Sequence, residues 1–415
     1  MDRDRDVLRE LGRQLAEVAA LPAQQQPAAL WRQLNGLRPA RPMVMIDQIA
    51  WHEMEVEDEL TLRCADPFCR SVETELRRQL YQWQHMRGDM VVEPMVAIPK
   101  VIHGVGFGID PQEQVLARDP SNDVVSHHYV DQIRTDEDIA KIRQLKPRLD
   151  VEATDARESR MPEIFDGILE INMQGELPVF APWDRIVEWR GAEAPLLDLV
   201  DRPDHTHAIL ERYTTVALYQ LDRLKEQGLL GPMQTTIHCT GAQTDELPGA
   251  GFDPSHVRAA DLWTYGMAQI LASVSPAMEE EFWLPYAARW FGRFGLGYYG
   301  CCEPLHHKID LIRSLPRVRK ISVSPFADVE ASAARIAGDY VVSRKPPPSL
   351  LAHDEWSPQA VEKDLRDTVA ICARHGCPVE LILKDISTVR YQPRRLWEWA
   401  RMAADVVGAG VPAAA

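Results

Sequence analysis

Two adjacent cysteines and a glutamate form the group in this sequence whose residue types are best suited to chemistry: Cys301, Cys302 and Glu303. They come at the end of an apolar segment typical of a β-strand, and His238 ends another such segment. Thiolate and imidazole are ligands that Zn²⁺ prefers, and a carboxylate can join them. The candidate ligands of this predicted metal site are Cys301, Glu303, His238 and Cys302. The alternative is that each cysteine is a small buried hydrophobe, because the spacing is not a Cys-x-x-Cys pattern.

Charged residues end two further strand-like segments. Lys345 follows the segment 339-343, and Lys384 and Asp385 close the segment 379-385. Lysine and aspartate side chains at such positions can act as general acids and bases or orient a substrate. We therefore treat Lys384, Asp385 and Lys345 as candidate catalytic residues. An internal ion pair between Lys384 and Asp385 is the alternative interpretation.

The segments that would position these residues alternate short apolar strands with helices, which is typical of a parallel sheet covered by helices. Eight strands favour closure into a single (β/α)8 TIM barrel of the α/β class over an open doubly wound sheet. No Gly-x-Gly-x-x-Gly follows the first strand to support a dinucleotide fold. Catalytic groups of such a barrel lie where strands end. The predicted strands are 43-47, 93-98, 168-173, 233-238, 296-301, 319-323, 339-343 and 379-385.

The chain divides into an N-terminal helical cap, residues 1-40, and the barrel, residues 41-410. The cap is an extension of two helices within 4-36, interrupted by Pro22. Two long segments, 104-123 and 241-258, are predicted to be loops, and long loops in a compact domain are usually functional. Helices are predicted at 276-293, 305-315, 329-336 and 358-375.

Composition narrows the classes of partner. The net charge is −16 and no basic cluster is present, which argues against nucleic acid. No apolar run approaches the roughly 20 residues that span a bilayer. No signal peptide is recognisable at the N-terminus, and the seven cysteines form no regular framework. We therefore expect a cytoplasmic protein with a small-molecule substrate and no membrane partner.

The sequence resembles the uroporphyrinogen decarboxylase superfamily in the order and spacing of several motifs, over roughly residues 40-408. The stretches that carry the resemblance are Tyr299-Gly300-Cys301-Cys302-Glu303-Pro304-Leu305, Ile321-Ser322-Val323-Ser324-Pro325 with Asp328, Ser343-Arg344-Lys345-Pro346, Leu383-Lys384-Asp385-Ile386-Ser387-Thr388, and Pro182-Trp183-Asp184 with Arg190-Gly191. This superfamily is a (β/α)8 barrel. It comprises metal-free decarboxylases of haem synthesis and zinc methyltransferases that move methyl groups between small substrates, corrinoid proteins and thiols or folate.

Departures from both patterns place the chain closer to the methyltransferases. It lacks the Arg-Gln-Ala-Gly-Arg segment with which the decarboxylases bind an acidic tetrapyrrole, and a chain of charge −16 without it is a poor receptor for a polyanion. The methyltransferases carry His-x-Cys where this chain has Tyr299 and Cys301. Their second cysteine lies on the last strand, where this chain has Asp385 and Ser387. The resemblance thus supplies one of three zinc ligands.

The leading hypothesis is an enzyme that moves a methyl group between a small methylated compound and a corrinoid protein, with Zn²⁺ as a Lewis acid. The corrinoid would be carried by the partner protein. A metal-free decarboxylase or lyase acting on a small acid or a tetrapyrrole is the first alternative, with Arg344, Lys345 and Lys384 binding carboxylate. A barrel that has lost catalysis and only binds a corrinoid or tetrapyrrole is the second.

Overall fold

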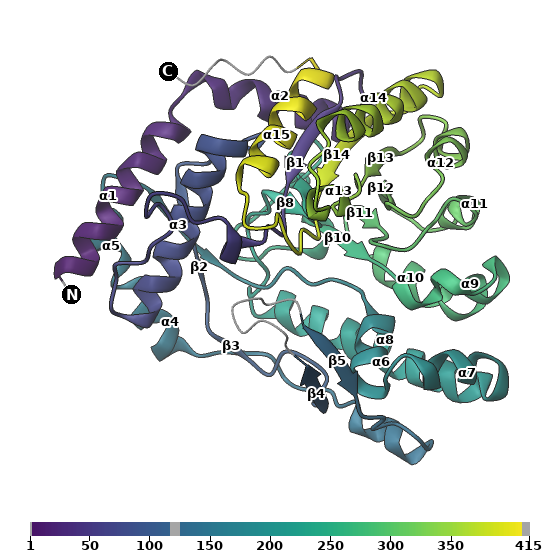
Figure 1. Cartoon of the computed structure of the whole chain (residues 1–415). Coiled ribbons are helices and arrows are strands. Elements are labelled where there is room, and N and C mark those ends of the chain that lie inside the picture. Colours follow the sequence, from purple (N-terminus) through teal and green to yellow (C-terminus); the bar gives the residue numbers. More distant parts are fainter. Residues whose placement is uncertain (1, 117–124, 409–415) are drawn as a thin grey trace.

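The computed structural model describes residues 2–116 and 125–408. At its centre lies a parallel sheet of six strands in the order β1-β14-β13-β12-β11-β10 (Figure 1). A separate parallel pair, β2-β7, continues the strand set. The strands of these two sheets are β1 (Met43–Ile46), β2 (Met95–Pro99), β7 (Glu170–Gln174), β10 (Trp263–Gly266), β11 (Leu296–Tyr299), β12 (Val318–Val323), β13 (Val341–Arg344) and β14 (Val379–Leu383).

Helices cover the outside of the six-stranded sheet and form a layer beside it (Figure 1). Several begin at a residue whose side chain accepts a backbone N–H, as at Ser275, Asp328 and Ser357, which is the usual N-cap arrangement. The helices are α1 (Asp2–Ala19), α2 (Gln25–Asn35), α3 (Pro67–Met86), α4 (Val151–Glu158), α5 (Met161–Phe165), α6 (Pro182–Arg190), α7 (Glu193–Asp201), α8 (Pro203–Glu226), α9 (Pro276–Phe282), α10 (Leu284–Phe291), α11 (Ile309–Ile312), α12 (Val329–Ile336), α13 (Ser349–Ala352), α14 (Pro358–Arg374) and α15 (Arg394–Val406). None of the helices in the described residues combines the length and apolar character needed to span a bilayer.

The prediction of a barrel strand at 233-238 is wrong. Only Thr236–Ile237 (β8) is extended there, and it pairs antiparallel with β9 (Thr240–Gly241). His238 and Cys239 have φ angles of 42° and 70°, so the chain reverses at these two residues instead of continuing as a strand. The next parallel strand along the chain after β7 is β10, which belongs to the six-stranded sheet. The sequence analysis missed this strand. The other seven predicted strands are confirmed, each with bounds shifted by a few residues.

Hydrogen bonding joins the parallel strands into two sheets and not into one ring. Two isolated parallel bridges start from the segment after β7. Glu176 pairs with Leu230 in the segment after α8, and Phe180 pairs with Gly266 in β10. The six-stranded sheet is strongly curved, since the hydroxyl of Tyr298 in β11 donates to Ser343 in β13 at 2.8 Å. A contact between strands that are not neighbours requires such curvature. Full closure into an eight-stranded barrel stays a prediction.

Predicted loops and helices need smaller corrections. Within 104-123, β4 (Glu113–Leu116) pairs antiparallel with β5 (Ser126–Tyr129), so this segment is more than a loop, while 117-124 lie outside the described residues. A second short pair joins β3 (Ile102–His103) to β6 (Arg148–Leu149). The predicted helix 276-293 is two helices separated at Trp283, and 305-315 shortens to α11. The helical extension is confirmed as α1 and α2, with a short 3-10 turn (Pro22–Gln24) between them.

A fully buried ion pair lies inside the curve of the sheet. Lys320 Nζ in β12 is 2.8 Å from Glu380 Oε2 in β14, and neither side chain is exposed to solvent. The hydroxyl of Thr240 donates to the same carboxylate oxygen at 2.7 Å, and the rings of Trp31 and Trp263 flank the ammonium at 5.1 and 5.7 Å. Two charges removed from water must satisfy each other, so this pair fixes the β8-β9 hairpin against the sheet.

Breaking this pair should destabilise the protein more than removing it entirely. Glu380→Leu leaves a buried, unpaired ammonium, for which we expect a loss of about 3–5 kcal/mol in the free energy of unfolding. The double variant Lys320→Met with Glu380→Leu removes both charges and should recover most of that loss. Urea unfolding of both variants checks this. A double variant no more stable than Glu380→Leu would contradict it.

Candidate active site at the ends of β11 and β14

Cys301 is positioned by a tight turn directly after β11. Gly300 has a φ of 91°, and a Cβ atom there would lie 2.5 Å from Leu305 Cδ1, so glycine is required on both counts. The Cys301 N–H donates to Glu303 Oε2 at 2.8 Å, and its carbonyl accepts from Ser322 Oγ at 2.7 Å. These bonds attach the turn to itself and to β12, so the sulfur has a defined position.

The sulfur of Cys301 contacts an ammonium group from a distant strand. Lys384, the residue after β14, places Nζ 3.1 Å from Cys301 Sγ, and both residues are buried. β11 and β14 are separated in the sheet by β12 and β13. An ammonium at this distance stabilises a thiolate more than a thiol, because opposite charges attract strongly away from water.

Cys302 and Asp385 extend this cluster toward solvent. Cys302 Sγ lies 3.6 Å from Cys301 Sγ and 3.3 Å from Asp385 Oδ2, and Asp385 also lies 3.3 Å from Lys384 Nζ. A thiol has a single proton, so Cys302 donates either to the neighbouring sulfur or to the carboxylate. The choice between them couples the protonation of these three groups.

These contacts separate the pKa values of the two thiols. The pKa of Cys301 is held well below its usual range, chiefly because Cys302 donates a hydrogen bond to its sulfur, with His238 and the charge of Lys384 adding to this. The pKa of Cys302 is raised by the same bond and by burial. Burial opposes the charge of Lys384, but Cys301, Cys239 and Asp385 together raise its pKa. These shifts favour a thiolate at Cys301 and an ammonium at Lys384.

His238 joins the cluster from the β8-β9 hairpin although it ends no barrel strand. Its ring packs on Tyr265 and Tyr298, with centroids 4.6 and 4.9 Å away. Burial lowers the pKa of its imidazole, which is therefore neutral at physiological pH. Its buried Nε2 has no partner at hydrogen-bonding geometry in the described part of the chain.

Glu303 and Lys345 are turned away from the sulfur. Glu303 accepts the backbone N–H groups of Cys301 and Ala268 at 2.8 and 3.3 Å, one on each oxygen, and burial raises its pKa to about 7. Lys345 donates to Tyr298 OH and Ser343 Oγ at 2.5 and 2.7 Å, and burial lowers its pKa to about 8. Both residues support the site from within the protein.

Zinc binding at the four predicted ligands stays a prediction. Among residues 2–116 and 125–408, no group of three or more His, Cys, Asp or Glu side chains is placed to hold a metal ion. Glu303 uses both carboxylate oxygens on backbone amides, and the sulfur of Cys301 is already in contact with an ammonium. Of the four candidate ligands, the structure brings together Cys301, Cys302 and His238, while Glu303 serves the backbone.

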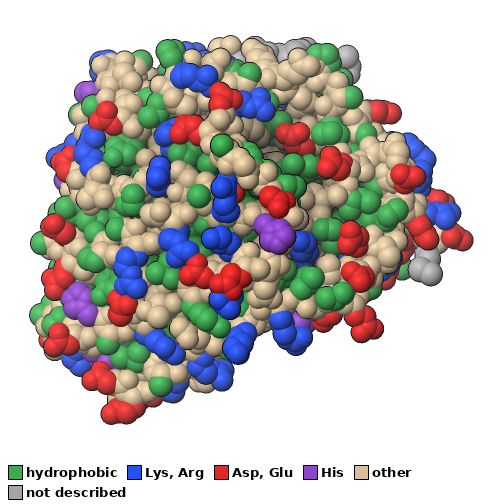
Figure 2. All heavy atoms as spheres, turned by 180° about the vertical axis from the view of Figure 1, so that it is seen from behind, with side chains coloured by type: hydrophobic (Ala, Val, Ile, Leu, Met, Phe, Trp, Pro, Cys, Tyr) green, Lys and Arg blue, Asp and Glu red, His purple; other side chains and the backbone are tan. Residues whose placement is uncertain are grey.

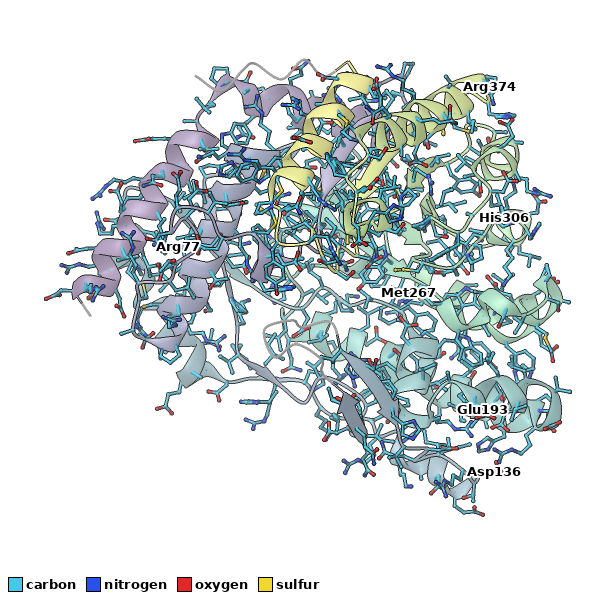
Figure 3. All side chains as sticks on the ribbon, in the orientation of Figure 1. Arg77, Asp136, Glu193, Met267, His306 and Arg374 are labelled. Carbon is cyan, nitrogen blue, oxygen red and sulfur yellow. The ribbon has the colours of Figure 1, made fainter. Side chains whose placement is uncertain are left out.

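Sequence analysis missed a cavity of about 770 Å³, of which one lining residue, Tyr265, packs on the ring of His238. Glu176, Asp184, Tyr265 and Met267 are among its lining residues, and Met267 lies at the centre of the molecule where β10 ends (Figure 3). Burial raises the pKa of Asp184 to about 6 and also raises that of Glu176. Glu176 follows the predicted strand 168-173 closely enough to have been a candidate. Tyr265 and Met267 were not found because β10, which positions them, was not predicted.

The thiolate of Cys301 should be visible without any substrate. We expect ultraviolet thiolate absorption at neutral pH that persists into mildly acidic solution and is lost in Cys301→Ser. Lys384→Met removes the adjacent positive charge, so the absorption should then disappear at a higher pH than in the wild type. Cys372→Ser, at a buried cysteine outside the cluster, is the matched control and should change nothing. Equal absorption in Cys301→Ser and the wild type would show that Cys301 is protonated.

No family model matches the sequence, and no curated protein is similar to it by sequence. Among solved structures, the chain is similar to a methyltransferase from Methanosarcina mazei. The similarity covers 92% of this chain and 98% of that chain, with 10% sequence identity and a TM-score of 0.51. At this identity the likeness shows that the two proteins share an α/β fold.

Proposed function

We propose that this protein is a methyltransferase that takes a methyl group from a small methylated compound on the thiolate of Cys301. The observation that carries the proposal is the buried 3.1 Å contact between Lys384 Nζ and Cys301 Sγ. A thiolate is a strong nucleophile toward carbon, and the hydrogen bond from Cys302, together with His238 and the charge of Lys384, lowers the pKa of this thiol. The likeness to a methyltransferase fold agrees with this chemistry.

The transfer has two steps. In the first, a lone pair of Cys301 Sγ forms a bond to the methyl carbon, and the broken bond leaves its electron pair on the departing heteroatom. In the second, an external nucleophile takes the methyl from the thioether and the sulfur leaves as a thiolate. A thiol of low pKa leaves more readily, and the ammonium of Lys384 would stabilise the departing charge. The same contact therefore favours both steps.

A corrinoid protein is the acceptor that the family resemblance implies, and we retain it as the proposed partner in the second step. The proposed scheme does not use zinc, because the described side chains do not form a three-ligand set.

The fold that we propose is a closed barrel in which β2 and β7 lie between β1 and β10 in the ring of strands. The curvature of the six-stranded sheet and the bridge Phe180↔Gly266 support closure.

The decarboxylase alternative has less support from the geometry. The guanidinium of Arg344 donates to the carbonyls of Ser324 and Lys345, and Lys345 is engaged with Tyr298, so neither cation faces an open cavity. The cavity instead presents Glu176 and Asp184, which would repel an acidic substrate.

Methyl transfer to Cys301 can be measured directly on the full chain. Methylcobalamin runs the second step in reverse, with the thiolate taking the methyl group and the electron pair of the broken bond staying on cobalt. We expect incubation with it to increase the intact mass by one methylene group per chain, and peptide mapping to place the methyl on Cys301. Cys301→Ser should show no increase. Cys372→Ser, at a buried cysteine outside the cluster whose pKa is raised by burial, is the matched control and should behave as the wild type. Methylation of any other residue in place of Cys301 would overturn the proposal.

Metal analysis of the same preparation, purified without chelators, tests whether the methylation depends on zinc. The proposed chemistry predicts less than one equivalent of zinc and unchanged methylation after dialysis against a chelator. One equivalent of zinc that is lost in Cys301→Ala, together with lost activity on chelation, would instead establish the zinc mechanism.

A further inference from the structure

The cavity beside Cys301 carries carboxylates that have no cationic partner. Arg185 pairs with Glu188 at 2.6 Å, and the guanidinium of Arg143 donates to the carbonyl of Gly108. Glu176 and Asp184 form no ion pair with any residue in the described ranges, and Asp184 accepts one side-chain hydrogen bond, from Gln269 at 3.2 Å. Both carboxylates are half-buried. A partly buried carboxylate without a counter-charge is unfavourable unless a ligand supplies one.

Aromatic rings form much of the remaining wall. Phe107, Trp189, Tyr213, Tyr265 and Trp290 all line the cavity. Phe107 and Tyr265 retain exposed surface, while the other three are buried behind them. The faces of such rings attract cations, and they attract alkylated ammonium and sulfonium groups in particular because these cannot donate hydrogen bonds to water. Unpaired carboxylates together with aromatic walls are complementary to an organic cation.

The cavity adjoins the thiolate through β10. Tyr265, near the end of this strand, lines the cavity and packs against the ring of His238, which in turn lowers the pKa of Cys301. Asp184 lies near enough to Cys301 for the thiolate to help raise the pKa of this carboxyl. Cys301 is not itself a lining residue of the cavity, so the rings of Tyr265 and His238 are the contacts that connect the cavity to the surroundings of the sulfur.

We infer that the methyl donor is an onium compound, a quaternary ammonium or a tertiary sulfonium, held in this cavity by Glu176 and Asp184. The inference rests on the proposed function and names its substrate class. In the transfer, Cys301 Sγ forms a bond to the methyl carbon, and the carbon–nitrogen or carbon–sulfur bond breaks with its electron pair staying on the heteroatom. The thiolate and the onium both become neutral. The leaving amine or thioether needs no proton and no Lewis acid.

Calorimetric titration of the full chain with tetramethylammonium tests this substrate class without requiring turnover. We expect tetramethylammonium to bind more tightly than tert-butanol, a neutral molecule of similar size and shape. Asp184→Asn and Glu176→Gln should each weaken cation binding by about tenfold, the equivalent of about 1.4 kcal/mol. Asp184→Glu keeps the charge and should retain most of the affinity.

The matched control is Glu193→Gln at the start of α7, an exposed carboxylate away from Met267 (Figure 3), which should bind as the wild type does. Thermal unfolding of each variant confirms that the chain is folded. Equal affinity for tetramethylammonium and tert-butanol, or unchanged affinity in both folded variants, would overturn the inference. Cation binding that persists in Cys301→Ser, with no methylation of the wild type, would remove the proposed function and leave the cation site standing.

Discussion

The structure depends on the curvature that brings the end of β14 against the end of β11. Lys384 and Cys301 belong to strands separated by two others, and yet their side chains meet at 3.1 Å. Neighbouring strands lie roughly 4.8 Å apart, so a flat sheet would hold these positions at about three times that spacing. The site exists only because the sheet bends, and the polar pairs Tyr298–Ser343 and Lys320–Glu380 inside the curve fix that bend.

Charge is distributed differently inside the curve of the sheet and in the wall of the cavity. Inside the curve, Lys320 and Lys345 are satisfied by Glu380 and by Tyr298 with Ser343, and these cations are closed to ligands. The cations of the cavity wall are likewise engaged, while some of its carboxylates are not. On the face in Figure 2, acidic and basic side chains are interspersed and no broad area carries only Lys and Arg.

The sequence predicts features that depend on local residue patterns better than features that depend on contacts between distant residues. The strand within 379-385 was predictable because Val379, Leu381, Ile382 and Leu383 form a short apolar run, which is a local signal. Cys301, Lys384 and Asp385 were found because strand ends converge in parallel folds. Glu303 was misjudged because its partners are the backbone amides of a turn, and sequence does not show which way a carboxylate points. β10 was missed because its four residues, Trp-Thr-Tyr-Gly, give too short a pattern.

The most direct test of the central claim measures how the single-turnover rate of Cys301 methylation by methylcobalamin depends on pH. The measurement compares the wild type with Lys384→Met. Because the charge of Lys384 adds to the hydrogen bond from Cys302 in lowering the pKa of Cys301, the wild-type rate should be constant from mildly acidic to mildly alkaline pH. Without the ammonium the pKa of the thiol rises, so the rate in Lys384→Met should fall as the pH is lowered and recover toward alkaline pH. Superimposable profiles for the two proteins would contradict the account.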